Sequence, residues 1–326
     1  MSEVKLKSKN NNYNIKNVLK DFGILLGLLV MGTVFSILSE HFLTIDNILT
    51  IALQTSVIGI LAIAETYVII TSGIDLSVGS ILAVAGVVTG KLMVSGVSIT
   101  LSIMAGIAVG AICGLITGLV ISRLNVAPFI ATLGMMSIGR GVAYVITGAM
   151  PVSGLPEKFF FIGGGSIGIV PIPMLEMFAL AIVFGFILKK TRFGRYVYCL
   201  GSNEEAAVLS GINVRNTKVW VYVISGSLAA FAGVMMASRL VSAQSTAGTG
   251  YELDAIAAAI IGGASPTGGS GKITETIIGA FIIGTLRNGL NLVNVNAFWQ
   301  QIAIGVVIIF AVYADNLRRK KGVAIN

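Results

Sequence analysis

Long apolar segments fill most of this chain and restrict the folds open to it. A helix that crosses a bilayer needs about 20 predominantly apolar residues, and eight segments approach or reach that length. They cover residues 22–38, 48–71, 99–122, 126–146, 174–188, 219–241, 273–292 and 298–314. Only 11% of the residues are charged, whereas soluble domains carry about 25%. The sequence therefore predicts an all-α polytopic membrane protein.

Two further apolar segments are too short to cross a bilayer as straight helices. The first covers residues 78–94 and follows the polar interruption at 73–80, and the second covers 255–263 and stops at Ser265-Pro266. We expect both to be broken or tilted helices. The total is then about ten transmembrane helices, or about eight if the two short segments only dip into the bilayer.

One apolar segment carries a regular row of glycines. Gly106, Gly110, Gly114 and Gly118 recur every four residues, which places them on one helix face. Small residues at this spacing let two backbones approach closely, as in GxxxG helix pairs. We interpret the row as a packing surface, either within the chain or between two copies.

Clusters of cations predict how the chain is oriented. Lysines crowd residues 1–20, and further cations lie at 189–195 and 318–321. Because cytoplasmic loops are enriched in Lys and Arg, we place these clusters and both termini in the cytoplasm. The organisation is then a tail (1–20), one transmembrane domain (21–318) and a second tail (319–326), with the first apolar run retained as a span. This topology explains the net charge of +8, so the expected surroundings are membrane lipid, and no nucleic-acid partner is expected.

A weak internal repeat divides the chain into two halves. Matching positions lie 171 residues apart (289 − 118 = 171). They are Gly118-Leu119 with Gly289-Leu290, Asn125 with Asn296, and Gly134 with Gly305. A displacement by five spans would invert one half relative to the other. Because inverted repeats with broken helices at matching places are typical of transporters, we expect two inverted repeats.

The longest polar interval between apolar segments, residues 189–217, contains a short helix with its own end signals. Ser202 is a favourable N-cap, and Glu205 three residues later completes a capping box. Glu204 adds negative charge to the first turn, where the helix dipole favours it, and Gly211 is expected to end the helix. Such a helix on a cationic loop is suited to being held by a cytoplasmic partner. The alternative is a solvated loop helix without a partner.

The residue types exclude several chemistries. The string GGSGK at 268–272 resembles a phosphate loop, but proline replaces its upstream glycine and Ile273 replaces the required Ser or Thr. One histidine, His41, and two cysteines, Cys113 and Cys199, provide no metal site, no disulfide framework and no hydrolase triad. We therefore expect no enzymatic activity, no metal and no cofactor bound by this chain. Any ATP-driven work would need a separate subunit.

Polar side chains within apolar segments are candidates for a substrate pathway, because leaving them unpaired in lipid is costly. A neutral polar solute would need amide or hydroxyl partners and an aromatic ring, which favours Asn291, Trp299 and Gln300, with Asn125 and Gln54 near span ends. Hydrogen bonding between helices is the alternative role for each of these residues.

Four charged residues have structural interpretations. Asp75 and Asp254 each lie at the start of a short apolar segment, where a carboxylate can cap a half-helix and compensate its dipole. Substrate binding is their less favoured alternative. Glu65 and Arg140 are embedded in spans, and an ion pair between them would be structural.

Several strings resemble known transport proteins. Glu205, Ala206, Ala207 and Gly211 resemble the E-A-A-x-x-x-G loop of membrane subunits in ABC importers. From about Asn47 to the C-terminus, the chain resembles the ribose-type monosaccharide permease family. The resemblance is carried by GSNEEAAVLSGINV (201–214), YELDAIAAAIIGG (251–263), GIDLSVGS (73–80) and TAGTG (246–250).

The resemblance implies the membrane-spanning permease subunit of an ATP-driven ABC importer in a bacterial cytoplasmic (plasma) membrane. Two cytoplasmic ABC ATPase subunits, which use ATP and Mg²⁺, would hold the loop at 189–217. An external sugar-binding protein would deliver a monosaccharide, and a second permease copy would complete a homodimer or a close heterodimer. The residues implied in ATPase coupling are Ser202, Asn203, Glu204, Glu205, Ala206, Ala207 and Gly211.

Ribose is the first choice of substrate on this resemblance, and galactose, xylose, a furanose signal or a nucleoside could use the same framework. A rival of another class is an ion- or proton-coupled secondary sugar carrier, in which Glu65 and Arg140 would be coupling residues. A receptor or assembly scaffold is a third possibility, for which the repeat and the broken helices offer no reason. Uptake that survives an uncoupler but requires ATP would favour the ABC importer.

Overall fold

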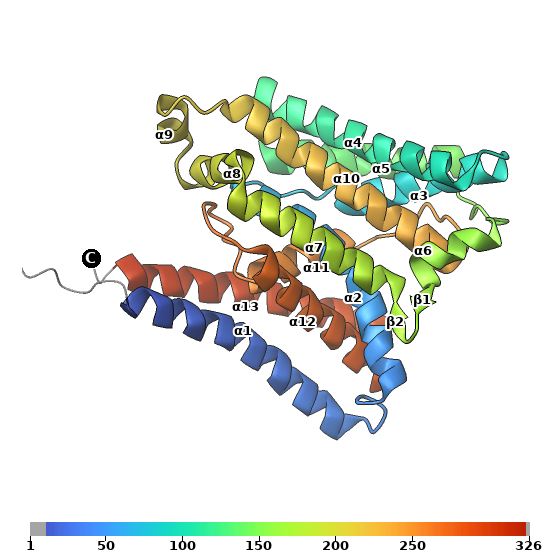
Figure 1. Ribbon diagram of the computed structural model, residues 1–326, viewed down its shortest axis with the longest axis horizontal. Helices are drawn as coiled ribbons and strands as arrows, with labels where there is room; N and C mark the ends of the chain where they lie inside the picture. Colours follow the sequence, from blue (N-terminus) through green and yellow to red (C-terminus); the bar gives the residue numbers. More distant parts are fainter. Residues whose placement is uncertain (1–10, 324–326) are drawn as a thin grey trace, which may run out of the picture.

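A computed structural model describes residues 11–323, which are mostly helical (Figure 1). The α-helices are α1 (Asn11–Leu38), α2 (Ile45–Ile70), α3 (Val78–Val94), α4 (Ile99–Arg123), α5 (Pro128–Thr147), α6 (Phe160–Gly164), α7 (Ile172–Lys190), α8 (Arg192–Ser202), α9 (Glu204–Leu209), α10 (Val214–Leu240), α11 (Tyr251–Ile261), α12 (Ile273–Leu292) and α13 (Ala297–Val323). A 3₁₀ helix, η1 (Glu157–Phe159), precedes α6. The strands β1 (Ser166–Ile167) and β2 (Val170–Pro171) form a small antiparallel hairpin, in which Ser166 pairs with Pro171.

The helices confirm the expected all-α polytopic fold. In the described part of the chain, α2, α4, α5, α7 and α10 are long and apolar enough to cross a membrane. Shorter apolar helices occur at Gly23–Leu38, at Val78–Val94 and at Ala297–Val307. Helix α3 has 17 residues and α11 only 11, so the two segments expected to be short are short.

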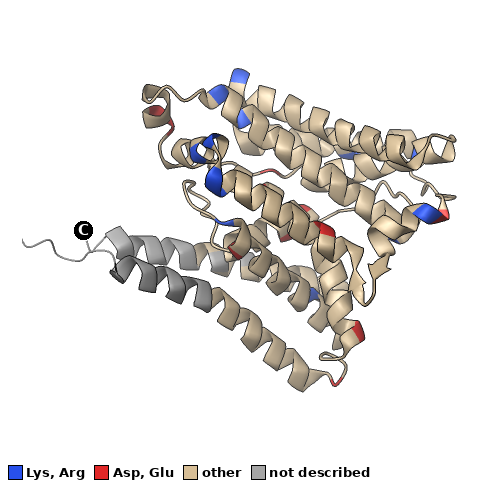
Figure 2. Ribbon diagram, viewed as in Figure 1, with Lys and Arg blue, Asp and Glu red and all other residues tan. Residues whose placement is uncertain are grey.

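The two ends of the bundle differ in charge. Helix α1 begins and α13 ends on the side that carries α8 and α9 (Figure 1), as expected if both termini and this loop face one compartment. Lys and Arg residues gather at the same end (Figure 2). The cations at the ends of α4 and α7, on α8 and at the start of α10 are Arg123, Lys189, Lys190, Arg192, Arg195, Arg215 and Lys218.

Helices α2 and α10 form the centre of the bundle. Helix α2 is buried without interruption from Thr55 to Ile70, because it packs against α7, α10, α11 and α12. The Tyr67 hydroxyl of α2 donates a 2.6 Å hydrogen bond to the Phe184 carbonyl of α7, and the two rings meet edge to face. Helix α10 packs mainly against α3 and α4.

The row of glycines on α4 confirms the packing interpretation. A Cβ at Gly110 or Gly114 would overlap the backbone carbonyl of Gly226 or Tyr222 on α10. Gly226 is equally restricted, because its own Cβ would overlap the Gly110 carbonyl. We call this contact between α4 and α10 the glycine seam. It lies within one chain, so these glycines do not serve a contact between two copies.

The helix arrangement agrees with two inverted halves. Helix α2 packs on α11 and α12, and its counterpart α10 packs on α3 and α4. Helix α4 ends near the start of α10, where Arg123 Nη2 donates a 3.1 Å hydrogen bond to Asn216 Oδ1. Helix α12 begins at this end of the bundle, beside α8. The counterparts α4 and α12 therefore run in opposite directions, as an inverted repeat requires.

Candidate functional site

The polar loop, residues 189–217, consists of two short helices and the start of α10, and side chains cap all three helices. Thr191 Oγ1 accepts from the Gly194 amide at 3.2 Å, Asn203 Oδ1 from the Ala206 amide at 2.9 Å, and Asn213 Oδ1 from the Asn216 amide at 3.0 Å. Such caps satisfy amides that have no partner within the helix. The loop is therefore a rigid structure and not a flexible connection.

The cap expected at Ser202 is wrong by one residue. Ser202 is the last residue of α8, and its hydroxyl donates a 2.9 Å hydrogen bond to the Tyr198 carbonyl. The N-cap of α9 is Asn203, because its extended backbone (φ −163°, ψ 108°) turns its side chain back over the first turn. The expected end of the helix is confirmed, since Gly211 follows α9 with φ +77°, a left-handed conformation that suits glycine.

Helix α9 has one buried face and one exposed face. Ala207 packs with Leu200 and Val214 in a small apolar cluster. On the other side, Leu209 is 89% exposed and Val208 is also exposed. Glu205 is exposed as well. A leucine that is exposed at a helix end and backed by a rigid frame is suited to contact another protein.

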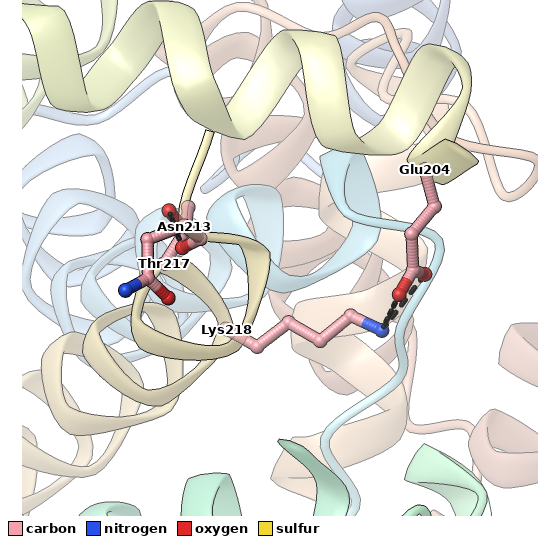
Figure 3. Close-up of polar contacts among 4 residues, drawn as sticks. All are labelled: Glu204, Asn213, Thr217 and Lys218. Carbon is pink, nitrogen blue, oxygen red and sulfur yellow. Dashed lines mark hydrogen bonds and ion pairs between the residues drawn. The ribbon is translucent and has the colours of Figure 1, made fainter. Parts of the chain in front are cut away.

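An ion pair joins the start of α9 to α10 (Figure 3). Lys218 Nζ lies 2.8 Å from both carboxylate oxygens of Glu204. The Glu204 side chain is 53% exposed and that of Lys218 is 21% exposed. Exposed pairs of this kind contribute about 0–1 kcal/mol, so the caps and the buried Ala207 contribute more to the position of α9. Beside the pair, Thr217 Oγ1 donates a 2.9 Å hydrogen bond to the Asn213 carbonyl (Figure 3).

Helix α8 is fastened to the end of α2. A Cβ at Gly201 would overlap the Ile70 carbonyl, so only glycine permits this approach. The same carbonyl accepts a 2.9 Å hydrogen bond from the Gly269 amide. Ser72 Oγ, which follows α2, donates to the Thr267 carbonyl at 3.0 Å. One small contact thus joins the polar loop, the end of α2 and the connection between α11 and α12.

The string GGSGK forms part of this contact and not a phosphate loop. Gly268 and Gly269 have φ values of +84° and +74°, which glycine adopts without strain. The Tyr198 hydroxyl of α8 donates a 2.7 Å hydrogen bond to the Gly271 carbonyl. Burial, with a smaller contribution from the Glu275 carboxylate, raises the pKa of Tyr198, so the phenol remains a donor. Lys272 forms an ion pair with Glu275.

The five residues predicted for a substrate pathway do not lie together. Gln300 Nε2 donates to Asn291 Oδ1 at 2.7 Å and to the Val295 carbonyl at 2.9 Å, at the end of α12 away from the polar loop. Trp299 is 66% exposed. Asn125 is exposed at the polar-loop end, directly after α4. Gln54 is half-buried on α2.

A cavity of about 260 Å³ lies among α11, α12, α13 and the segment before α11. Asp254 and Arg287 line it, and Arg287 Nη2 lies 2.7 Å from Asp254 Oδ2. Phe298, Gln301 and Thr249 also line it. Within the described residues, Asp254 Oδ1 and Arg287 Nε have no hydrogen-bond partner. The cavity therefore lies beside an ion pair whose unpartnered atoms are buried, and an aromatic ring and an amide also line it.

Asp254 does not cap α11, so this prediction is wrong. The N-cap of α11 is Gly250, and Asp254 lies inside the first turn of the helix, paired with Arg287. Asp75 precedes α3, where its Oδ1 accepts from the Ser77 amide at 2.9 Å and its Oδ2 accepts from Ser225 Oγ at 2.7 Å. Asp75 therefore organises the chain just before α3, whose N-cap is Ser77, and ties this segment to α10.

Glu65 and Arg140 do not form an ion pair with each other. Arg140 Nη1 donates to the Ser245 and Ala247 carbonyls at 2.5 and 2.9 Å, so it holds the segment before α11 against α5. Glu65 is fully buried, and its carboxylate oxygens have no hydrogen-bond partner among the described residues. The ion pair that does form joins the buried Asp254 of α11 to the partly exposed Arg287 of α12.

The polar contacts of Arg287 and Asn288 could not be identified from the sequence. Arg287 lies within an apolar segment, and that position alone marks it as a candidate. The reciprocal amide pair Asn47–Asn288, with hydrogen bonds of 3.0 and 2.8 Å, joins α2 to α12. Neither partner could be identified from spacing, because the two asparagines are 241 residues apart.

Known proteins show extended similarity to this chain. The family model described as branched-chain amino acid transport system / permease component matches residues 47–312. Ribose import permease protein RbsC of Escherichia coli (strain K12) is 47% identical over 299 residues, which are 90% of this chain and 93% of that protein. Ribose import permease protein RbsC of Bacillus subtilis (strain 168) is 43% identical over 323 residues, 98% of this chain and 99% of that protein. The D-allose transport system permease protein AlsC of Escherichia coli (strain K12) is 40% identical over 315 residues, 96% and 97% of the two chains. No solved structure matches this chain.

Proposed function

Because the chain belongs to the family described as branched-chain amino acid transport system / permease component, we propose that it is the membrane-spanning subunit of an ATP-driven ABC importer for ribose. The family membership and the apolar helices make it a multi-pass inner-membrane transport subunit and not a catalytic enzyme. Ribose as substrate rests on the two relatives named ribose import permease, at 47% and 43% identity. ATP and Mg²⁺ would be bound by a partner subunit.

The observation that carries the proposal is the construction of helix α9. It presents Leu209, which is 89% exposed, on a frame of three capped helices. An ATPase subunit that gripped this helix would move α8 and the start of α10 with it. The assigned coupling residues are Ser202, Asn203, Glu204, Glu205, Ala206, Ala207 and Gly211, with Val208 and Leu209 added from their exposure.

The contact at Gly201 supplies a route from the loop to the interior. A movement of α8 would act on the Ile70 carbonyl at the end of α2 and on Gly269 in the connection to α12. Both elements lead to the region of α11, α12 and α13. ATP-driven closure of two ATPase subunits would then open and close this region by a rigid-body movement, as in alternating access.

The sugar would pass along the cavity lined by Asp254 and Arg287. The exposed part of the Arg287 side chain can donate to a sugar hydroxyl, and the Phe298 ring can pack on a sugar face. The amide of Gln301 adds a further donor and acceptor. We retain Asn291, Trp299 and Gln300 as secondary pathway residues at the adjoining end of α12.

The remaining partners and the orientation follow from the same assignment. The polar loop and both termini would face the cytoplasm, in agreement with the cations at that end of the bundle. An extracytoplasmic binding protein would dock at the opposite end, and a second permease copy would complete the channel.

Reconstituted uptake tests the proposal. The permease is assembled in proteoliposomes with a candidate ABC ATPase and a candidate sugar-binding protein from the same organism, and radiolabelled ribose uptake is measured with ATP, without ATP and with a protonophore. We expect uptake that requires ATP and persists with the protonophore. Uptake that needs an ion gradient and no ATP would contradict the importer assignment. Uptake of galactose, xylose, D-allose or a nucleoside in preference to ribose would leave the mechanism intact and change the substrate.

A further inference from the structure

A groove of about 690 Å³ lies between α7 and α12 at the polar-loop end of the bundle. Its walls are apolar, and they include Ile182 and Phe186 from α7 and Ile277 and Ile278 from α12. Ile182 and Phe186 are exposed. The groove is separate from the cavity of α11–α13, since the two share no lining residue.

The groove is closed at one end and cationic at the other. Away from the polar loop, the rings of Phe178 and Phe281 stack with their centroids 6.3 Å apart, which joins α7 to α12. Beside the polar loop, Lys189, Lys190 and Lys272 line the opening. Lys272 is already paired with Glu275. Lys189 and Lys190 are exposed, and in the described part of the chain neither forms an ion pair.

This distribution of charge identifies one kind of occupant. A soluble anion would match the lysines but leave the apolar walls in contact with water. An apolar helix of a partner protein would match the walls but leave the two lysines without counter-charges. An anionic phospholipid matches both, because it carries a phosphate at the depth of the lysines and acyl chains that run into the bilayer. Basic pockets between transmembrane helices on the cytoplasmic side are known to bind such head groups.

We propose that the groove between α7 and α12 is a binding site for one anionic phospholipid. Its phosphate contacts the ammonium groups of Lys189 and Lys190, and one acyl chain lies along Ile182, Phe186, Ile277 and Ile278. Tyr198 and Lys272, which fasten α8 to the α11–α12 connection, also line the groove. The bound lipid therefore lies against the segment that joins the polar loop to the bundle. This site does not depend on which sugar is carried.

Lys189 and Lys190 also have a structural role, which the test must distinguish from binding of the lipid phosphate. They lie in the last turn of α7, where cations stabilise any helix through its dipole. Arg192 and Arg195 on α8 provide a matched control. They are exposed cations at the same end of the bundle, but they do not line the groove. Replacing either pair removes the same net charge.

Native mass spectrometry of the purified full-length permease provides the measurement. The protein is titrated in detergent with dioleoyl phosphatidylglycerol or dioleoyl phosphatidylcholine, and bound lipids are counted per chain. We expect wild type to bind one phosphatidylglycerol at least about fivefold more tightly than phosphatidylcholine. Lys189→Gln/Lys190→Gln should bind the two lipids about equally, whereas Arg192→Gln/Arg195→Gln should retain the preference for phosphatidylglycerol.

A second variant tests the apolar part of the site. Gly185 lines the groove, and a Cβ there would meet only Ile273, at 3.7 Å. Gly185→Leu should fill the groove and weaken the binding of both lipids without changing the charges. Ile182→Trp, at an exposed position, serves the same purpose if Gly185→Leu does not fold.

Four outcomes would overturn the proposal. The first is a preference for phosphatidylglycerol that survives Lys189→Gln/Lys190→Gln, and the second is an equal loss in the arginine control. The third is competition by soluble glycerol phosphate as strong as that by the lipid, which would indicate a head-group site only. The fourth is unchanged lipid binding in whichever of Gly185→Leu and Ile182→Trp folds. If the oligomeric mass of that variant also changes, the groove is a contact between two copies.

Discussion

The glycine seam and the α11–α13 region show two different ways of packing helices in one membrane protein. In the seam, α4 and α10 approach so closely that carbonyl oxygens occupy the places of missing Cβ atoms. Helices α11 and α12 also approach closely, at Gly279, but the contact of α12 with α13 includes the amide pair Asn291–Gln300, and a cavity remains beside the ion pair Asp254–Arg287. Backbone packing leaves no alternative arrangement, whereas polar side chains can exchange partners. The comparison supports α4 and α10 as a fixed frame, and we propose that solute passes through the α11–α13 region.

The strongest test of this difference is a large residue in the seam. Gly114→Leu should abolish folding or lower stability by about 3 kcal/mol or more, because the Tyr222 backbone cannot move away as a side chain could. The measurement is the yield of monodisperse protein and its melting temperature in detergent. Gly134→Leu on α5 is the matched control, since a Cβ at Gly134 meets nothing within 4 Å. Equal behaviour of the two variants would show that the seam is not rigid.

The second test removes the ion pair of the cavity. Asp254→Ala leaves the Arg287 guanidinium without its counter-charge and should cost about 3 kcal/mol in stability and at least about tenfold in ribose uptake. The double variant Asp254→Asn/Arg287→Gln removes both charges, so it should recover the stability but not the uptake. Melting temperature and uptake in proteoliposomes distinguish the two effects. Uptake restored along with stability would assign the pair a structural role only.

The third test addresses the exposed tip of α9. Leu209→Asp should lower ATP-dependent uptake about tenfold, because it places a charge in the proposed contact with the ATPase. The melting temperature should not change, since Leu209 is 89% exposed. Leu209→Ile, a conservative replacement at the same exposed position, is the control and should transport normally. Normal uptake by Leu209→Asp would remove this residue from the coupling contact.

The fourth test concerns the amides predicted from the sequence. Asn291→Ala and Gln300→Ala should each reduce uptake by about two- to fivefold, a smaller effect than at Asp254, because these amides already satisfy each other. The yield of assembled protein should be unaffected. Normal uptake in both variants would exclude them from the pathway.

Much of the fold could be predicted because it depends on composition and periodicity. The apolar segments, the short α3 and α11, the glycine row and the end of α9 at Gly211 are all local properties of the sequence. The partners of buried polar groups could not be predicted. Arg140 bonds carbonyls more than 100 residues away, and Asp254 pairs with Arg287 and not with a helix end. Such pairs depend on which helices become neighbours, and the local pattern does not contain that information.

The smallest expected effect is on the contacts that hold α9 in place. They are an exposed ion pair, which can exchange partners, and a helix cap, which cannot. Glu204→Gln or Lys218→Gln removes an exposed ion pair and should cost no more than about 1 kcal/mol. Asn203→Ala removes the cap of α9 and should cost about 1 kcal/mol or more. Melting temperatures for the two single variants and the double variant Glu204→Gln/Lys218→Gln give the coupling energy. A coupling energy above about 2 kcal/mol would mean that the ion pair, and not the cap and the buried Ala207, fixes the position of α9. Salt provides an independent check, since high ionic strength weakens an exposed ion pair but leaves a neutral cap unchanged.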